Sequence, residues 1–229
     1  MSEHSINIDA LHNLHQDIKQ NSPHPDKVKI IAVTKTLPPS AIISAIKNGI
    51  QCIGENKVQE FETKKSKLSQ HQQIFKTHLI GHLQSNKINR AIKLFNIIET
   101  VDSVSLAQKI NNRLTTQTAQ QKIYIQINVG GDPNKYGFPI KGLFKQIEKI
   151  EKLENVIIEG LMTILPYVEN TKNTQTYFKK MKKIHTQTKQ KISPTCTNLS
   201  MGMSRDYIYA LREGATHIRI GTKLYGQRK

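Results

Sequence analysis

Eight short apolar runs, each separated from the next by a longer segment with helical spacing, dominate the pattern of this 229-residue chain. The runs span residues 28–35, 51–55, 77–82, 97–102, 122–129, 156–164, 196–201 and 217–221. Between them apolar residues recur three or four positions apart, as in Ala41, Ile42, Ala45 and Ile46, and in Leu143, Ile147 and Ile150. Strands that alternate with helices predict right-handed crossovers and a parallel sheet buried on both faces.

Eight such units in about 200 residues fit a closed (β/α)8 TIM barrel, a single α/β domain with little room for decoration. We expect residues 1–229 to form one domain, with an N-terminal helix and linker in 1–27 and the barrel in 28–228. The helix, predicted over about residues 5–19, is expected to cover the barrel bottom. An open doubly wound sheet is the alternative, although VTKTLPPS follows the first run where a dinucleotide-binding turn would be glycine-rich.

The composition is that of a globular chain, with 37% hydrophobic residues, a mean hydropathy of −0.49 and no Trp. No apolar stretch is long enough to span a bilayer, and the first twenty residues lack the apolar core of a secretory signal, so we expect a cytoplasmic protein without membrane contact. The formal net charge is +17. Lysines cluster at two places, which are Lys64, Lys65 and Lys67, and Lys179, Lys180, Lys182 and Lys183. We favour solvated helix faces over nucleic-acid binding because no aromatic or helix-turn-helix signature accompanies them.

The cysteines and histidines do not show the close spacing in sequence that is typical of a zinc site. Cys52 and Cys196 lie far apart beside apolar runs, which favours buried reduced thiols over a disulfide or a metal site. His12 and His15 are helix neighbours without further ligands, so we interpret them as a surface helix face.

In a barrel of this kind the active face lies at the carboxyl ends of the strands, so polar residues just after each run are the candidates. Lys35 closes the first run. Desolvation in a pocket ringed by strand ends would lower the pKa of its amine, as a Schiff-base lysine requires. The alternative is an ordinary lysine that snorkels from a strand end, and position alone does not decide between the two.

The last two runs carry a second signal. Gly221 and Thr222 follow the eighth run, where many barrels bind phosphate through backbone N–H groups and a hydroxyl, and Gly202 and Ser204 follow the seventh. The alternative is a pair of tight turns in which glycine supplies backbone freedom and Ser204 caps a helix. Arg219 alternates inward between two isoleucines and requires partners if it is buried.

Two further candidates are weaker. Asn56, beside Glu55, is expected either to cap the helix after the second run or to contact a ligand. Lys135 lies in the polar segment GDPNKYGF and is expected to be a loop lysine, with the pocket rim as the other possibility.

Taken in order, these segments resemble the YggS/PROSC family of pyridoxal 5′-phosphate (PLP) homeostasis proteins. The motifs that carry the resemblance are IAVTKTLPPSAI, IGENKVQE, HLIGHLQSNK, ETVDSVSLAQKI, IQINVGGDPNKYGF, EGLMTI and LSMGMSRDYIYALREGATHIRIGTKLYGQR. The resemblance implies a barrel like the N-terminal domain of alanine racemase, with PLP bound covalently to Lys35 as an aldimine. It further implies that Arg219 faces the pyridine nitrogen and that Ser204, Gly221 and Thr222 hold the phosphate. Asn56, because of its place beside Glu55, is expected to contribute to cofactor binding as well.

The resemblance implies a PLP carrier or regulator that maintains vitamin B6 homeostasis without substrate turnover. The alternative is an amino-acid racemase, which needs two placed acid/base groups and a closed site. We expect no second such group and no closing domain, because four residues follow the last barrel element. Arginine at the pyridine nitrogen would also weaken the ring as an electron sink. The expected partners are PLP and PLP-dependent apoenzymes, and the expected state is a monomer or a weak dimer.

Overall fold

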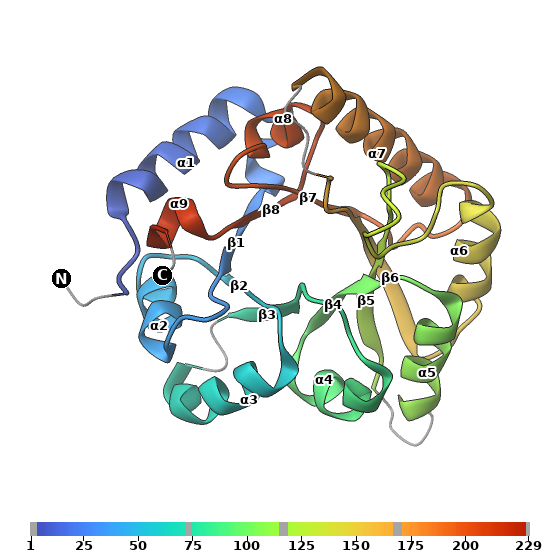
Figure 1. Ribbon diagram of the computed structural model, residues 1–229, viewed down its shortest axis with the longest axis horizontal. Coiled ribbons are helices and arrows are strands. Elements are labelled where there is room, and N and C mark those ends of the chain that lie inside the picture. The colour runs from blue at the N-terminus through green and yellow to red at the C-terminus, as the bar shows by residue number, and fades with distance from the viewer. Residues whose placement is uncertain (1–3, 72–74, 115–118, 167–170, 228–229) are drawn as a thin grey trace.

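The computed structural model describes residues 4–71, 75–114, 119–166 and 171–227. Eight parallel strands close into a barrel in the order of the sequence, with β8 paired to β1 (Figure 1). The strands are β1 (Lys29–Val33), β2 (Cys52–Glu55), β3 (Lys76–Leu79), β4 (Ile97–Val101), β5 (Gln121–Gln126), β6 (Val156–Met162), β7 (Asn198–Met203) and β8 (His217–Ile220). The predicted TIM barrel is confirmed.

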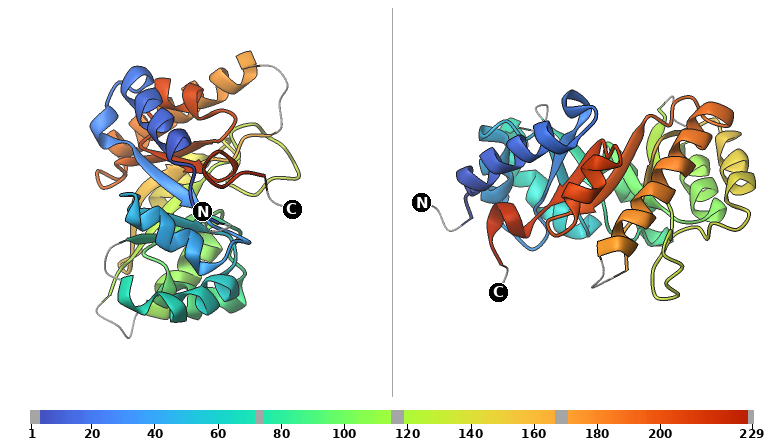
Figure 2. Two further views of the ribbon diagram at one scale, coloured as in Figure 1. Left: turned by 90° about the vertical axis from the view of Figure 1, so that its left-hand side faces the viewer. Right: turned by 90° about the horizontal axis from the view of Figure 1, so that it is seen from above.

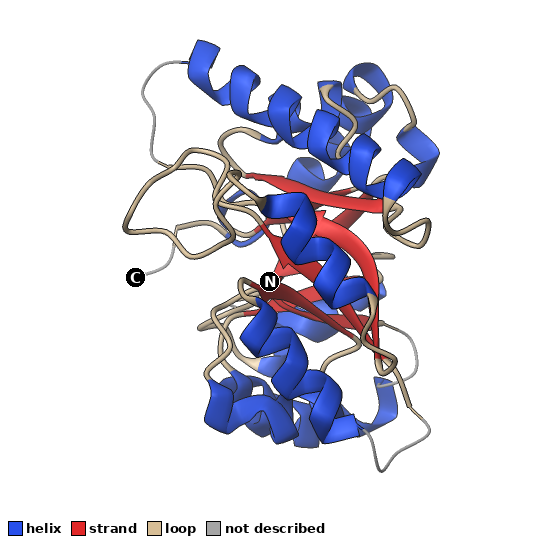
Figure 3. Ribbon diagram, turned by 90° about the vertical axis from the view of Figure 1, so that its right-hand side faces the viewer, coloured by secondary structure: helices blue, strands red, loops and turns tan. Residues whose placement is uncertain are grey.

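Helices surround the strands as an outer layer (Figure 3). They are α1 (Ile8–Asn21), α2 (Pro39–Lys47), α3 (Val58–Lys65), α4 (Ile88–Leu94), α5 (Val104–Leu114), α6 (Leu143–Glu151), α7 (Thr171–Lys191), α8 (Tyr207–Arg212) and α9 (Thr222–Tyr225). Short 3-10 helices, named η, occupy Pro25–Lys27, Ser66–His71 and Ser85–Lys87. The two helices predicted from apolar spacing, around residues 41–46 and 143–150, correspond to α2 and α6. No helix among the described residues is both long and apolar enough to cross a membrane.

The strands are stabilised by the burial of both of their faces. In β1, Ile30 and Ala32 pack outward into the main apolar cluster that the helices complete. On the inner side, a Cβ at Gly54 of β2 would lie 2.8 Å from Cγ2 of Ile31, so the close approach of these strands requires glycine. Burial on both sides explains why the strands are continuous apolar runs in the sequence.

All eight predicted strands are present, and their ends differ from prediction by at most three residues. The largest differences are at β3 and β5, which stop at Leu79 and Gln126 although the apolar runs continue. Backbone hydrogen bonds between neighbouring strands continue one residue further, from the Ile80 N–H to the Glu55 carbonyl and from the Ile127 N–H to the Met162 carbonyl. β1 also ends earlier than predicted, so Lys35 lies in the turn after it, two residues beyond Val33.

The N-terminal helix is present, but it does not cover the barrel bottom as expected. α1 packs against α8 and α9 in the outer layer, so it extends the helix ring beside α9, which has only four residues (Figures 1 and 2). The backbone N–H of Asn7 donates to the carbonyl of Leu224 over 2.8 Å, and the Tyr207 hydroxyl donates to the Asp17 carboxylate. A short final helix leaves apolar barrel surface uncovered, and α1 buries it with Leu11, Leu14 and Ile18.

Candidate functional site

A cavity of about 590 Å³ opens at the carboxyl ends of the strands. Its volume falls in the range of small-molecule sites. Its wall contains all six residues that the sequence analysis assigns to cofactor binding, which are Lys35, Asn56, Ser204, Arg219, Gly221 and Thr222. Apolar side chains complete the wall, among them Val33, Ile80 and Leu165. Residues separated by up to 187 positions therefore share one chamber.

Lys35 is half-buried at the cavity wall, between two anchored threonines. The hydroxyl of Thr34, which is fully buried, donates to Oε1 of Glu55 over 2.6 Å. Thr36 adopts a left-handed φ of 64°, and its N–H donates to Oε1 of Glu60 over 2.5 Å. Holding a β-branched residue in this conformation costs about 1–3 kcal/mol of free energy, and the surrounding contacts have to offset that cost. The backbone that carries Lys35 is therefore fixed on both sides.

Lys64 of α3 ties these anchors together. Its ammonium donates to Glu55 Oε1 and Glu60 Oε1, both at 2.7 Å, and to the Thr34 carbonyl at 2.8 Å. Burial raises the pKa of Glu55, and the opposing charge of Lys64 does not fully offset it. The solvated-face interpretation is wrong for Lys64, whose side chain is 7% exposed. It holds for Lys179, Lys180, Lys182 and Lys183, which are exposed.

The loops after β7 and β8 meet at the cavity. The backbone N–H of Lys223 donates to Oγ of Ser204 over 3.4 Å, which joins the two loops directly. Ser204 does not cap α8, because Asp206 is the N-terminal cap residue and its carboxylate accepts the N–H of Met203 over 2.6 Å. Gly202 adopts a backbone conformation that requires glycine, because its φ is 91° and a Cβ at this position would lie 2.6 Å from Cβ of Ala210.

Arg219 reaches the cavity from β8 while remaining 3% exposed. Its Nη1 donates to Oγ of Ser200 over 2.7 Å and its Nη2 to the carbonyl of Thr163 over 2.6 Å. Oε2 of Glu99 lies 3.9 Å from Nη1. Burial lowers the pKa of Arg219, against the effect of the nearby carboxylates, but a guanidinium stays protonated in proteins. The partners that a buried arginine requires are thus present in the protein itself.

A hydrogen-bonded chain continues from Arg219 into the barrel. The Ser200 hydroxyl donates to Oε2 of Glu99 over 2.7 Å, and Nδ1 of His78 contacts Oε1 of the same carboxylate at 2.6 Å. Burial alone would raise the pKa of Glu99, but His78, Arg219 and Ser200 hold it below its ordinary value. The network fixes the guanidinium of Arg219 before any ligand arrives.

Comparison with known proteins assigns the family. A family model described as alanine racemase, N-terminal domain, matches residues 6–229. A pyridoxal phosphate homeostasis protein of Aquifex aeolicus (strain VF5) is 37% identical over 201 residues, covering 88% of this chain and 87% of that protein. The chain belongs to the pyridoxal phosphate homeostasis protein family. A relative of the same name from Haemophilus influenzae is 32% identical over 227 residues and covers 99% of this chain and 95% of its own.

A solved structure of a relative is similar throughout. PipY of Synechococcus elongatus PCC7942, solved with PLP bound, is 34% identical to this chain with a TM-score of 0.84. The match covers 95% of this chain and 99% of PipY. The family resemblance drawn from the sequence motifs is confirmed.

Asn56, which also lines the cavity, makes a close backbone contact and does not cap a helix. The N-terminal cap residue of α3 is Lys57 and no side-chain hydrogen bond caps the helix. A Cβ at Gly81 would lie 2.2 Å from the Asn56 carbonyl oxygen, so only glycine lets the loop after β3 approach Asn56. Of the two interpretations offered for Asn56, capping is wrong.

Lys135 lines the cavity, so of its two interpretations the pocket rim is correct. The loop that carries it folds back on Asn128, whose amide donates to the carbonyls of Asp132 and Lys135 at 2.7 and 3.2 Å. Next to Lys135, the ring of Tyr136 stacks on that of His82 with 3.9 Å between centroids, and the Asp102 carboxylate lies 3.3 Å from the His82 ring. The loop is therefore held at two points, by Asn128 and by His82.

The cavity wall also holds titratable residues that the sequence analysis missed. Asp206 and Tyr209 line it together with Lys135, so titratable side chains other than that of Lys35 are present in the wall. Their place in the sequence, inside LSMGMSRDYIY, offered a signal, because the loop after the seventh run was already a candidate. Burial raises the pKa of Asp206, against the Met203 N–H that it accepts and the charge of Arg219.

Proposed function

We propose that the chain binds pyridoxal 5′-phosphate on Lys35 and passes it to PLP-dependent apoenzymes, without turning over a substrate of its own. One observation carries the proposal, which is that Lys35, Arg219 and the two loops with Ser204 and Thr222 line a single cavity. The amine of Lys35, the guanidinium of Arg219, which only donates hydrogen bonds, and the loops that carry hydroxyls match three parts of PLP. These parts are the aldehyde, the ring nitrogen and the phosphate.

Lys35 forms the covalent link in this proposal. Its amine condenses with the aldehyde to give an imine, and one water molecule leaves. The clamp of Lys64 on Thr34 and Glu60 supports this role, because it fixes the backbone on both sides of Lys35. A fixed backbone reduces the entropy lost when the long lysine side chain is ordered by the bond.

The phosphate is held by Ser204, Gly221 and Thr222. The hydrogen bond between the Lys223 N–H and Ser204 brings the two loops within reach of one group. Hydroxyls and backbone N–H groups donate strongly to a charged phosphate, and Arg205 adds a cationic side chain to the same wall. Asn56 contacts the cofactor from the opposite loop.

Arg219 favours a carrier over an enzyme. A guanidinium has donors only, so the ring nitrogen that it faces must accept and stay unprotonated. PLP supplies an electron sink when it is bound, and the sink is weaker when the ring nitrogen carries no proton. Ser200, Thr163 and Glu99 hold the guanidinium in place, which supports a site built to retain the cofactor rather than to activate it.

A racemase would need two acid/base groups positioned on opposite faces of its substrate. Asp206 lines the cavity, but its carboxylate accepts the Met203 N–H and supports the turn after β7. We therefore assign it a structural role. We further propose that residues 1–229 act as one PLP-binding domain, as a monomer or a weak dimer.

The test loads the full-length chain with PLP, removes the excess and measures two quantities. The first is reactivation of an aminotransferase apoenzyme, and the second is turnover of alanine by the loaded chain alone. We expect cofactor transfer and no turnover near the enzyme range of about 1–10³ per second. Turnover in that range that is abolished by Lys35→Ala would overturn the carrier assignment.

A further inference from the structure

A second cluster of chemical groups lies inside the barrel, on the side of the Arg219 network away from the cavity. Cys52 of β2, His78 of β3 and His217 of β8 are 2%, 1% and 4% exposed. One ligand atom from each lies within 4.8 Å of the others. Cys52 is a free thiol. Two imidazoles and a thiol in one buried place are the donor types that zinc prefers.

His78 is oriented in the way that metal-ligating histidines are. Its Nδ1 is bonded to Glu99 at 2.6 Å, and this carboxylate is fixed in turn by Ser200. Its Nε2 is buried and has no hydrogen bond within the part of the chain that the structure describes. A carboxylate on one ring nitrogen fixes the ring and makes the other nitrogen a better ligand.

The His217 ring is also held in a fixed orientation, on the other side of the cluster. Its Nδ1 lies 2.9 Å from Oγ1 of Thr216, which fixes the ring. This contact leaves the other ring nitrogen as the atom that can bind a metal ion.

We propose that Cys52, His78 and His217 bind one zinc-type divalent ion inside the barrel, with a water molecule as the fourth ligand. Zinc bonds of about 2.0–2.3 Å place its ligand atoms roughly 3.3–3.8 Å apart, so small side-chain rotations close the site. Binding displaces the thiol proton of Cys52 and any proton on Nε2 of His78 to solvent. The resulting thiolate and the Glu99 carboxylate supply two negative charges against the two positive charges of the ion.

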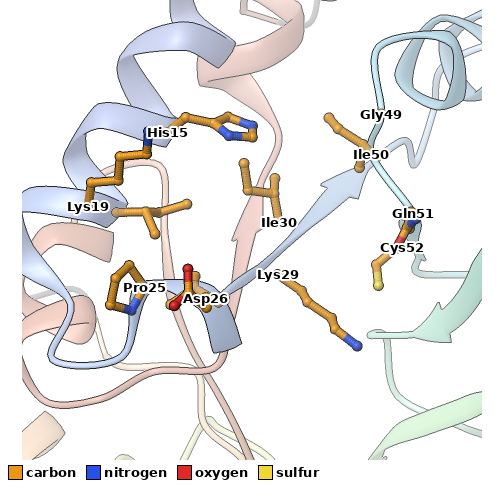
Figure 4. A pocket seen from close by; sticks show the side chains of 12 residues that line it. His15, Lys19, Pro25, Asp26, Lys29, Ile30, Gly49, Ile50, Gln51 and Cys52 are labelled. Carbon is orange, nitrogen blue, oxygen red and sulfur yellow. The ribbon is translucent and has the colours of Figure 1, made fainter.

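A second cavity lies beside the cluster. It has a volume of about 290 Å³, lies at the amino-terminal ends of β1 and β2, and includes Cys52, Lys29 and Asp26 in its wall (Figure 4). The cluster is therefore near the amino-terminal end of the barrel, away from the cavity at the carboxyl ends of the strands. The sequence could not show this site, because its three ligands become neighbours only when β8 closes the barrel beside β1.

The test uses the untagged full-length chain titrated with Co²⁺, which reports its ligands by colour. We expect one Co²⁺ per chain, tetrahedral ligand-field bands and a thiolate-to-cobalt charge-transfer band. Added Zn²⁺ should remove all of these bands. Cobalt bound at surface histidines or at a cofactor phosphate lacks the thiolate band, so a spectrum without that band in the unaltered protein would overturn the proposal.

Matched cysteine variants locate the ion. Cys52→Ala should lose the thiolate band and weaken Zn²⁺ binding, measured against a chromophoric chelator, by more than the roughly 100-fold limit typical of second-layer changes. Cys196→Ala removes the other buried thiol and should leave both readouts unchanged. Near-ultraviolet circular dichroism shows whether each variant is folded. Equal Zn²⁺ affinity in unaltered and Cys52→Ala protein would contradict the site.

Discussion

Arg219 lies between two very different surroundings, which are the cavity on one side and the barrel interior on the other. Toward the cavity lie Lys35 and Ser204, which are half-buried, and Thr222, which is exposed. Toward the barrel interior lie Ser200 and Glu99, which are fully buried and hydrogen-bonded to each other. The cavity side lines a space that can admit a ligand, whereas on the interior side Ser200 is hydrogen-bonded to both Glu99 and Arg219.

This difference shows how the barrel can prepare a charged site without a ligand present. Buried charges are costly unless they are paired and hydrogen-bonded, and Glu99 has His78, Ser200 and Arg219 around it. The interior network therefore sets the position of Arg219 in advance. Ligand binding then depends on the cavity side alone, so changes on the two sides should have separable effects on stability and on PLP retention.

The largest effect is expected where the backbone of Lys35 is anchored. Lys64→Met should lower the free energy of unfolding by about 3–5 kcal/mol, because it leaves the buried Glu55 carboxylate without its cation. The same change should lower PLP occupancy, since Thr34 and Glu60 lose their common partner. Urea unfolding followed by circular dichroism measures the first quantity, and absorbance of the bound cofactor measures the second.

Lys67→Met is the matched control, because Lys67 is exposed and lies three residues away. It should change the free energy of unfolding by less than about 0.5 kcal/mol. Similar losses in the two variants would mean that Lys64 is not an anchor for the site.

The next effect isolates the cavity side. Thr222→Val removes the hydroxyl that we propose donates to the phosphate, a hydrogen bond worth about 1.5–3 kcal/mol. PLP should therefore bind roughly ten- to a hundred-fold more weakly while the free energy of unfolding is unchanged. Thr222→Ser keeps the hydroxyl and should bind as the unaltered protein does. Equilibrium dialysis with PLP and with pyridoxal measures both variants. If Thr222→Val weakened the two ligands equally, the hydroxyl would not be a phosphate contact.

The third prediction compares the interior side with the cavity side by changing one serine on each. Ser200→Ala breaks the bridge between Arg219 and Glu99 and should cost about 1–3 kcal/mol of unfolding free energy. Ser204→Ala should cost less than about 0.5 kcal/mol of stability but should weaken PLP binding. Parallel urea unfolding and dialysis of both variants test this. The division of the site into two sides fails if both serines change stability and retention in the same proportion.

The barrel could be predicted from the sequence because burial on both faces leaves a strong periodic signal. Each strand, from Lys29–Val33 to His217–Ile220, is a continuous apolar run with a helical segment after it. Strand ends were less predictable, since buried apolar residues continue past the end of a strand, as Ile80 does after Leu79. The place of α1 was missed because it depends on how short α9 is, which the pattern does not show.

The cavity residues could be predicted because topology places them. Lys35, Ser204 and Thr222 each follow a strand, and the carboxyl ends of parallel strands meet at one face. The supporting residues could not be found in this way. Lys64 looks like any surface lysine on a charged helix, and its burial follows only from the packing of α3 against β2.

The central claim is that Lys35 carries the cofactor, and reduction with borohydride followed by peptide mass mapping tests it most directly. Borohydride converts the imine to a stable secondary amine, so the phosphopyridoxyl group stays on the lysine that held it. We predict a single major adduct on Lys35, absent from Lys35→Ala. An adduct found mainly on Lys135, or spread over surface lysines, would contradict the account.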